Sequence, residues 1–197
     1  CLLIFDEVIT GFRLAAGGAQ EYFGVRADLV TFGKTIGGGM PVGAYAGTRA
    51  LMEQVAPCGP VYQAGTLSGN PVAMAAGLAQ LQILTDHPEV YTVMETSARY
   101  IANHLRASAD KHGVKMQVNQ VGSLLCPYFT ETPVDCFAAA KTSDTAKYAK
   151  YFNKMLLRGV YLAPSQFEAM FVSSAHTQND LACTVQAAEE SIAALGN

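Results

Sequence analysis

The chain has 197 residues, of which 50% are hydrophobic and 15% are charged, and its formal net charge is −3. This composition can bury a sizeable core, which excludes general disorder. The sequence contains no basic run, so a surface that binds nucleic acid or another polyanion is not expected. No uninterrupted apolar stretch reaches the roughly 18 residues of a membrane-spanning helix.

The first 70 residues contain short apolar runs separated by glycines and prolines. Leu2–Phe5 and Leu29–Phe32 predict strands covered on both faces, as in a parallel sheet, and Val42–Ala46 predicts a third strand. A Gly-rich segment runs from Gly33 to Gly43, and the segment from Pro57 to Gly69 predicts a loop. Because the chain opens directly on the first strand and without an initiator methionine, we expect it to be part of a longer protein.

Helical patterns follow this loop. Asn70 and Pro71 predict the cap and first position of a helix that continues to about Thr85. A second helix is predicted from Pro88 to just before Gly113. The side chains expected on its apolar stripe are Val90, Val93, Met94, Ile101 and Leu105.

The last part of the chain predicts alternating strands and helices. The expected strands are Val114–Val118, Leu124–Phe129, Val160–Leu162 and Met170–Ser173. A helix is predicted from Ser143 or Asp144 to Gly159, with Ala149, Phe152 and Leu156 facing inward. Thr177 and Asp180 have the spacing of a capping box, which predicts a final helix through Ile192.

These patterns predict an α/β protein in three parts. Residues 1–85 form part of a sheet domain, residues 86–107 form a connecting helix, and residues 108–197 form a smaller α+β domain. The five cysteines are scattered and form no C-x-x-C pair, and the four histidines show no metal-ligand spacing. We therefore expect free thiols and no metal site.

The Gly-rich segment does not match a nucleotide-binding motif. A phosphate loop needs a glycine five positions before Gly33, where the sequence has Asp28. The dinucleotide pattern that starts at Gly37 needs a glycine at the position of Val42.

Lys34 and Asp6 point to a different chemistry. Small neighbours leave room beside the Lys34 amine, and partial burial by adjacent strands would favour its neutral form, which condenses with aldehydes. Asp6 ends an apolar strand, at the edge where α/β sheets place ligands. A carboxylate there is favoured by a cationic partner such as a protonated pyridine nitrogen, although it could also form a helix cap or a salt bridge. The pair predicts a pyridoxal phosphate site.

Two segments carry a resemblance to a known family. Residues 3–13 resemble the strand motif of the class III, fold type I aminotransferases, and residues 31–44 resemble their cofactor-lysine segment. Within the family, residues 17–20, 59–71, 159–169 and 175–177 resemble an aminomutase branch. The likeness runs essentially from end to end of the chain.

The resemblance implies a large domain that binds the cofactor and a small C-terminal α+β domain. It implies that Lys34 binds pyridoxal 5'-phosphate covalently and, once released, moves protons. The implied cofactor also takes the form of pyridoxamine 5'-phosphate, which donates nitrogen to the substrate. Asp6 would pair with the pyridine nitrogen, and Val8 would pack on the ring. The implied reaction is intramolecular amino transfer from glutamate-1-semialdehyde to give 5-aminolevulinate in tetrapyrrole biosynthesis.

The resemblance also implies a homodimer in which Gly65 and Thr66 hold the cofactor phosphate of the neighbouring subunit. Glu168 would lie near polar groups of the substrate, or it is a surface carboxylate. His176 is interpreted as structural. The implied partners are a small-molecule substrate and a second copy of the chain, with no nucleic acid or membrane. The implied location is the cytoplasm, or the plastid stroma in a plant or alga.

Family members carry a comparable length of chain before the position of Cys1, including the main phosphate-binding loop. We therefore expect this chain alone to bind the cofactor weakly and to be inactive. Two alternatives remain open. One is an ω-amino-acid aminotransferase that uses the same cofactor and two substrates, and the other is a non-catalytic dimerisation module.

Overall fold

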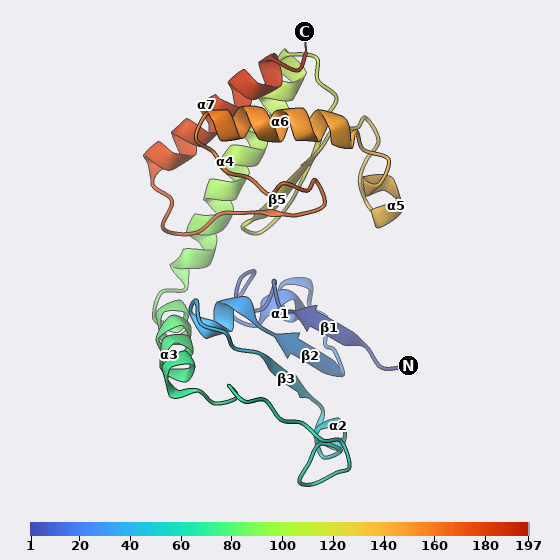
Figure 1. The fold of residues 1–197 in the computed structure, drawn as a ribbon, viewed down its shortest axis with the longest axis vertical. Helices are drawn as coiled ribbons and strands as arrows, with labels where there is room; N and C mark the ends of the chain where they lie inside the picture. The colour runs from blue at the N-terminus through green and yellow to red at the C-terminus, as the bar shows by residue number, and fades with distance from the viewer. Residues whose placement is uncertain (197) are drawn as a thin grey trace. The chain divides into compact units, whose positions relative to one another are not determined.

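The computed structural model describes residues 1–196, which form two compact units, residues 1–91 and the residues from Thr92 onward (Figure 1). The boundary falls within helix α4 (Glu89–Lys111). The three-part division at residues 85 and 107 stays a prediction. Among the described residues, no helix is both long enough and apolar enough to cross a membrane.

The first unit contains a three-stranded sheet in the order β1-β2-β3. Strand β1 (Ile4–Glu7) runs parallel to β2 (Leu29–Phe32), and β3 (Ala44–Gly47) runs antiparallel to β2. All three strands were predicted, although β1 and β3 begin two residues later than expected. The sheet is therefore mixed, and its parallel pair is β1–β2.

The prediction that the first strand is buried on both faces is wrong. Leu2, Leu3 and Ile4 are all exposed. Within the described residues β1 pairs only with β2 and therefore lies at the edge of the sheet.

Helix α3 (Pro71–Asp86) confirms the predicted cap and start. The Asn70 side chain accepts hydrogen bonds from the amides of Val72 (3.1 Å) and Ala73 (3.2 Å), and proline occupies the first helical position, where its missing N–H costs nothing. The short helices α1 (Gly18–Phe23) and α2 (Arg49–Met52) were not predicted.

The second unit packs helices around an antiparallel sheet in the order β4-β5-β6. Its strands are β4 (Gln117–Val121), β5 (Leu124–Tyr128) and the two-residue β6 (Met170–Phe171). Helices α6 (Thr145–Leu157) and α7 (Gln178–Ala193) were predicted, whereas the short α5 (Phe137–Ala140) was not.

Two strand predictions in this unit are wrong. The strand expected at Val114–Val118 begins at Gln117 instead. Residues 160–162 form no strand, because the amide of Val160 donates to the Met155 carbonyl (3.0 Å) and closes α6 rather than joining a sheet.

The core of the second unit comes from α4, α6, α7 and the sheet. The α4 stripe contains Ile101 and Leu105 as predicted, but Val93 is 49% exposed. The predicted inward face of α6 is wrong for Ala149 and Leu156, which are exposed, whereas Phe152 packs against the core as predicted. The buried side chains of this helix are Tyr148, Tyr151 and Met155. The Tyr148 hydroxyl donates to the Ala163 carbonyl (2.6 Å), which allows this polar ring to enter the core.

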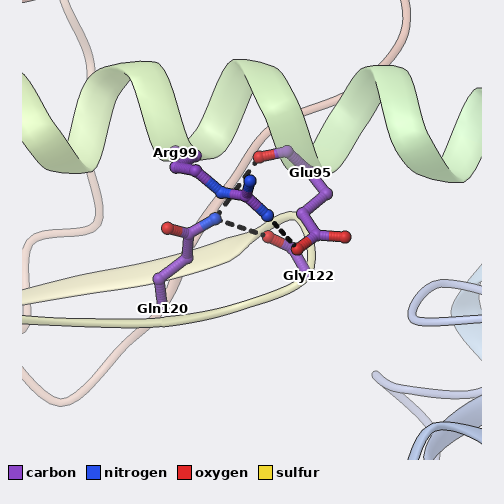
Figure 2. Close-up of polar contacts among 4 residues, drawn as sticks. All are labelled: Glu95, Arg99, Gln120 and Gly122. Carbon is purple, nitrogen blue, oxygen red and sulfur yellow. Dashed lines mark hydrogen bonds and ion pairs between the residues drawn. The ribbon is translucent and has the colours of Figure 1, made fainter.

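The β4–β5 turn is tied to α4 by polar contacts (Figure 2). The Gln120 side-chain amide donates to the carbonyl of Glu95 (3.3 Å) and to that of Gly122 (3.1 Å). The Arg99 guanidinium donates to the Glu95 carboxylate (2.6 Å) one helical turn away. The bond from Gln120 to the Glu95 carbonyl holds the hairpin against the helix, whereas the other two bonds lie within the hairpin and within α4.

The predicted capping box at the start of α7 is confirmed. The Thr177 hydroxyl accepts from the Asp180 amide (3.2 Å), and the Asp180 carboxylate accepts from the amide (2.8 Å) and hydroxyl (2.7 Å) of Thr177. The Thr177 hydroxyl, then its amide, lower the pKa of Asp180 below its ordinary value. A carboxylate with a lowered pKa stabilises the fold above its unfolded-state pKa, and this contribution is lost as the pH falls through its folded-state pKa.

We expect Thr177→Ala to lower the free energy of unfolding by about 1 kcal/mol at neutral pH, since it removes the cap hydroxyl. The difference should shrink in acid, because protonation of Asp180 removes the charge that strengthens these bonds. Urea unfolding at neutral and acidic pH measures both values, and Thr177→Ser is the matched control. An equal loss at both pH values would show that the carboxylate does not contribute.

Candidate active site

The carboxyl ends of β1 and β2 bring the predicted residues Asp6, Val8 and Lys34 to one edge of the sheet. Asp6 lies directly opposite Thr31 in the parallel register, and Lys34 follows Thr31 by three residues. The backbone of Gly33 passes next to Val8, because a Cβ added at Gly33 would lie 3.3 Å from a Val8 methyl group. This edge of a parallel strand pair is where α/β proteins bind ligands.

The Asp6 carboxylate is exposed and partly fixed by two donors. Its Oδ1 accepts from the Val8 amide (3.1 Å) and from the Thr31 hydroxyl (3.3 Å). Within the described residues no recorded donor reaches Oδ2, so this oxygen is available to a cationic ligand. The sequence analysis did not single out Thr31, because its place opposite Asp6 depends on the strand register, which only the structure shows.

Lys34 begins the 3₁₀ helix η1 (Lys34–Gly37) in a left-handed backbone conformation, with φ of 47°. For a residue with a side chain this conformation costs roughly 1–2 kcal/mol, and such strain is concentrated at functional sites. The expectation that adjacent strands partly bury Lys34 is wrong, because its side chain is exposed. The strands end before Lys34, and the turn carries it beyond their cover.

Two glycines allow α3 to pack directly on the turn that carries Lys34. A Cβ on Gly77 would lie 2.4 Å from the Ile36 carbonyl oxygen, and a Cβ on Gly38 would lie 2.5 Å from that of Ala76. Neither position accepts a side chain without movement of the backbone. Gly77 lies inside a helix, where glycine is costly, and the sequence analysis did not single it out although this unfavourable position is a signal of close packing.

These side chains fit a flat, cationic aromatic heterocycle that carries an aldehyde. The Asp6 Oδ2 can pair with a protonated ring nitrogen, Val8 offers an apolar contact, and the Lys34 amine can condense with the aldehyde.

Gly65 and Thr66 lie in the exposed irregular segment before α3. Gly65 lines a cavity of about 280 Å³ together with Pro41 and Gly43, and its carbonyl accepts from the Ser68 amide (2.9 Å). Among the described residues, no recorded hydrogen bond joins Gly65 or Thr66 to the other predicted site residues of this unit.

Glu168 belongs to the second unit, where it is exposed and lines a cavity of about 430 Å³ together with His176. The Cys126 thiol donates to the carbonyls of Gln166 (3.3 Å) and Glu168 (3.7 Å), so strand β5 anchors the loop that presents Glu168. The Nδ1 atom of His176 accepts from the Ser173 amide (3.1 Å), a contact within the turn before α7.

Burial raises the pKa of the Cys126 thiol above its ordinary value. Because the thiolate is the nucleophile, Cys126 should resist alkylation at mildly alkaline pH in the folded protein. The other four cysteines are exposed, so we expect iodoacetamide to add rapidly to those four and to reach the fifth only in denaturant. Intact-mass measurement counts the adducts, and Cys126→Ala should show four in both conditions. Rapid addition of five groups to the folded chain would contradict this prediction.

This chain belongs to the class III aminotransferase family, whose model matches residues 1–187. It is 64% identical over 191 residues to the glutamate-1-semialdehyde 2,1-aminomutase of Ruminiclostridium cellulolyticum, and 58% identical over 190 residues to that of Sulfurihydrogenibium azorense. These alignments cover 97% and 96% of this chain but 44% of each relative. The chain thus spans less than half the length of these curated relatives.

Solved structures agree with this assignment. An ω-transaminase from Sphaerobacter thermophilus matches with a TM-score of 0.86 and 30% identity, over 97% of this chain and 44% of that one. A glutamate-1-semialdehyde aminomutase from Pseudomonas aeruginosa matches with a TM-score of 0.85, over 98% of this chain and 45% of that one. The two sequences are 22% identical, so this likeness concerns the fold alone. The predicted fold class, α/β of fold type I, is confirmed.

Proposed function

We propose that this chain provides the lysine-bearing part of a pyridoxal phosphate-dependent aminomutase that converts glutamate-1-semialdehyde to 5-aminolevulinate. The observation that carries the proposal is the shared sheet edge, where Asp6 keeps one oxygen available and Lys34 presents its amine. The similarity to curated aminomutases supports the choice of substrate.

When bound, the cofactor supplies an electron sink for carbon–hydrogen bond cleavage next to the amino group. Asp6 would pair with the ring nitrogen and favour its protonated form. Lys34 would hold the cofactor and, as a free amine, would accept and return protons at the substrate carbons. We propose that Val8 packs on the ring and that Glu168 orients polar groups of the substrate.

The activity requires residues that the relatives carry outside the matched region, so we propose that this chain alone is inactive. The test uses a hybrid enzyme in which this chain replaces the matched region of the Ruminiclostridium cellulolyticum relative. We expect the hybrid to form 5-aminolevulinate from glutamate-1-semialdehyde without a 2-oxo acid, and the chain alone to form none. Turnover by the chain alone would refute its proposed inactivity, and an inactive hybrid would refute the aminomutase proposal.

A second candidate is an ω-amino-acid aminotransferase, favoured by the structural likeness to the Sphaerobacter thermophilus enzyme. It predicts net transfer of an amino group to a 2-oxo acid. Assaying the hybrid enzyme with glutamate-1-semialdehyde alone, and with an ω-amine plus pyruvate, separates the two reactions.

We also propose that the active form is a homodimer in which Gly65 and Thr66 bind the cofactor phosphate of the partner. The segment that carries them is exposed and includes the apolar side chains Val61, Tyr62 and Leu67. Sedimentation of the hybrid enzyme should show a dimer, and Thr66→Ala should weaken cofactor binding more than Thr142→Ala, a surface control. A monomeric active hybrid would refute the shared site.

A further inference from the structure

Glu7 is a fully buried carboxylate next to the proposed cofactor residue Asp6. Because side chains alternate along a strand, Asp6 faces outward from β1 whereas Glu7 faces inward, and its exposed fraction is 0%. A buried carboxylate is costly unless donors compensate its charge, so its contacts need a specific explanation.

Three donors from the following segment converge on Glu7. The Thr10 hydroxyl (2.7 Å) and the Ala19 amide (2.7 Å) donate to Oε2, and the Gln20 amide (3.0 Å) donates to Oε1. A carboxylate accepts with both oxygens, whereas a glutamine amide would place its own N–H groups against one set of these donors. The contacts therefore require the acid rather than the isosteric amide.

The backbone around this carboxylate is packed too closely for side chains. A Cβ on Gly18, whose φ is +68°, would lie 2.3 Å from Glu7 Oε2. The Gly11 amide donates to the Glu7 carbonyl (2.8 Å), and a Cβ on Gly11 would lie 2.7 Å from that oxygen. Glu7 thus holds the segment from Val8 to Gly18 against the end of β1. Its side chain and its main-chain carbonyl both accept hydrogen bonds that contribute to this contact.

This closed segment begins with the residue that orients Asp6. The Val8 amide donates to Asp6 Oδ1 (3.1 Å), and the position of that amide depends on the turn that Glu7 holds. We propose that Glu7 is a positioning residue, which fixes the Val8 amide and through it directs Asp6 Oδ2 toward the ring nitrogen of the cofactor. The consequence for the cofactor rests on the proposed function, whereas the fixing of Asp6 does not.

The first experiment uses this chain without cofactor. Because the Val8 amide donates to Asp6, its hydrogen exchange measured by NMR should be slowed, and this protection is the Val8 response. We expect Glu7→Gln to reduce this response at least severalfold, and Glu21→Gln to leave it unchanged. Glu21 is the matched control, because it is exposed and accepts from the Gly17 amide of the same segment (2.6 Å). An undiminished Val8 response in folded Glu7→Gln would overturn the proposal.

A second pair of variants, which disturbs the structure less, tests the proposal if Glu7→Gln does not fold. Thr10→Val removes one donor to Glu7 with little change in shape, and Thr10→Ser restores the hydroxyl. We expect the Val8 response to fall in Thr10→Val and to recover in Thr10→Ser. Equal responses in the two variants would contradict the proposal even if Glu7→Gln does not fold.

The second experiment uses the hybrid enzyme. We expect Glu7→Gln to raise the dissociation constant of pyridoxal phosphate about tenfold, a typical effect of disturbing hydrogen bonds to a charged group, and to alter the pH dependence of its absorption spectrum. Unchanged cofactor affinity and spectrum in a folded variant would refute the link to the cofactor. If the unmodified hybrid binds no cofactor, the proposed function fails, whereas the Val8 response still decides whether Glu7 fixes Asp6.

Discussion

Replacing Lys34 by alanine is expected to abolish covalent cofactor binding and to reduce turnover of the hybrid enzyme by at least about 10³-fold. Loss of proton transfer alone accounts for roughly 10²–10⁴-fold, and loss of the covalent link adds to it. The exposed amine at the end of β2 is the group that performs both tasks in the proposed mechanism.

Borohydride reduction followed by peptide mass mapping measures the covalent link directly. The cofactor should be attached to the peptide that contains Lys34, and no attachment should be found in Lys34→Ala. Lys150→Ala, at an exposed position in α6, is the matched control and should retain both attachment and turnover. Added small primary amines should partly restore turnover of Lys34→Ala. Attachment to a different lysine would refute the assignment.

The Asp6→Asn substitution is expected to lower kcat of the hybrid enzyme by roughly 10²–10³-fold, the scale for removing one preorganised electrostatic contact. Asparagine preserves the shape and can still accept from the Val8 amide, but it carries no charge to keep a ring nitrogen protonated. Cofactor attachment to Lys34 should persist, so we expect this variant to lose turnover while it retains covalent cofactor binding.

The matched control is Asp28→Asn. Asp28 Oδ2 accepts from the Leu3 amide (2.8 Å) just before β1, so this variant perturbs the same strand away from the site. Its kcat should stay close to that of the unmodified hybrid. Equal losses in the two variants would show that strand stability, rather than the charge of Asp6, determines the rate.

Local sequence signals predicted the elements whose ends are set by neighbouring residues. The Asn70 cap and the capping box at Thr177 identified the starts of α3 and α7, because both depend on contacts within a few positions. The spacing of Lys34 and Asp6 after two apolar runs likewise placed both residues at one sheet edge, since parallel strands end at the same edge.

Features that depend on distant contacts were not predicted. The buried face of α6 was assigned from apolarity alone, whereas Tyr148 enters the core because its hydroxyl reaches the Ala163 carbonyl in another segment. The contacts of Glu7 with Ala19 and Gln20 depend on how the chain returns after the strand. Only the folded backbone shows that an acidic residue next to Asp6 is buried.

The contact between Gly77 and the Ile36 carbonyl has a consequence for engineering. Alanine at a helical glycine commonly raises stability by about 0.4–1 kcal/mol, so routine thermostabilisation would select this substitution. Here the added methyl group would push the helix away from the segment that carries the reactive amine. A screen that scores only melting temperature could therefore accept a variant with a displaced nucleophile, and position 77 should be kept constant in any library.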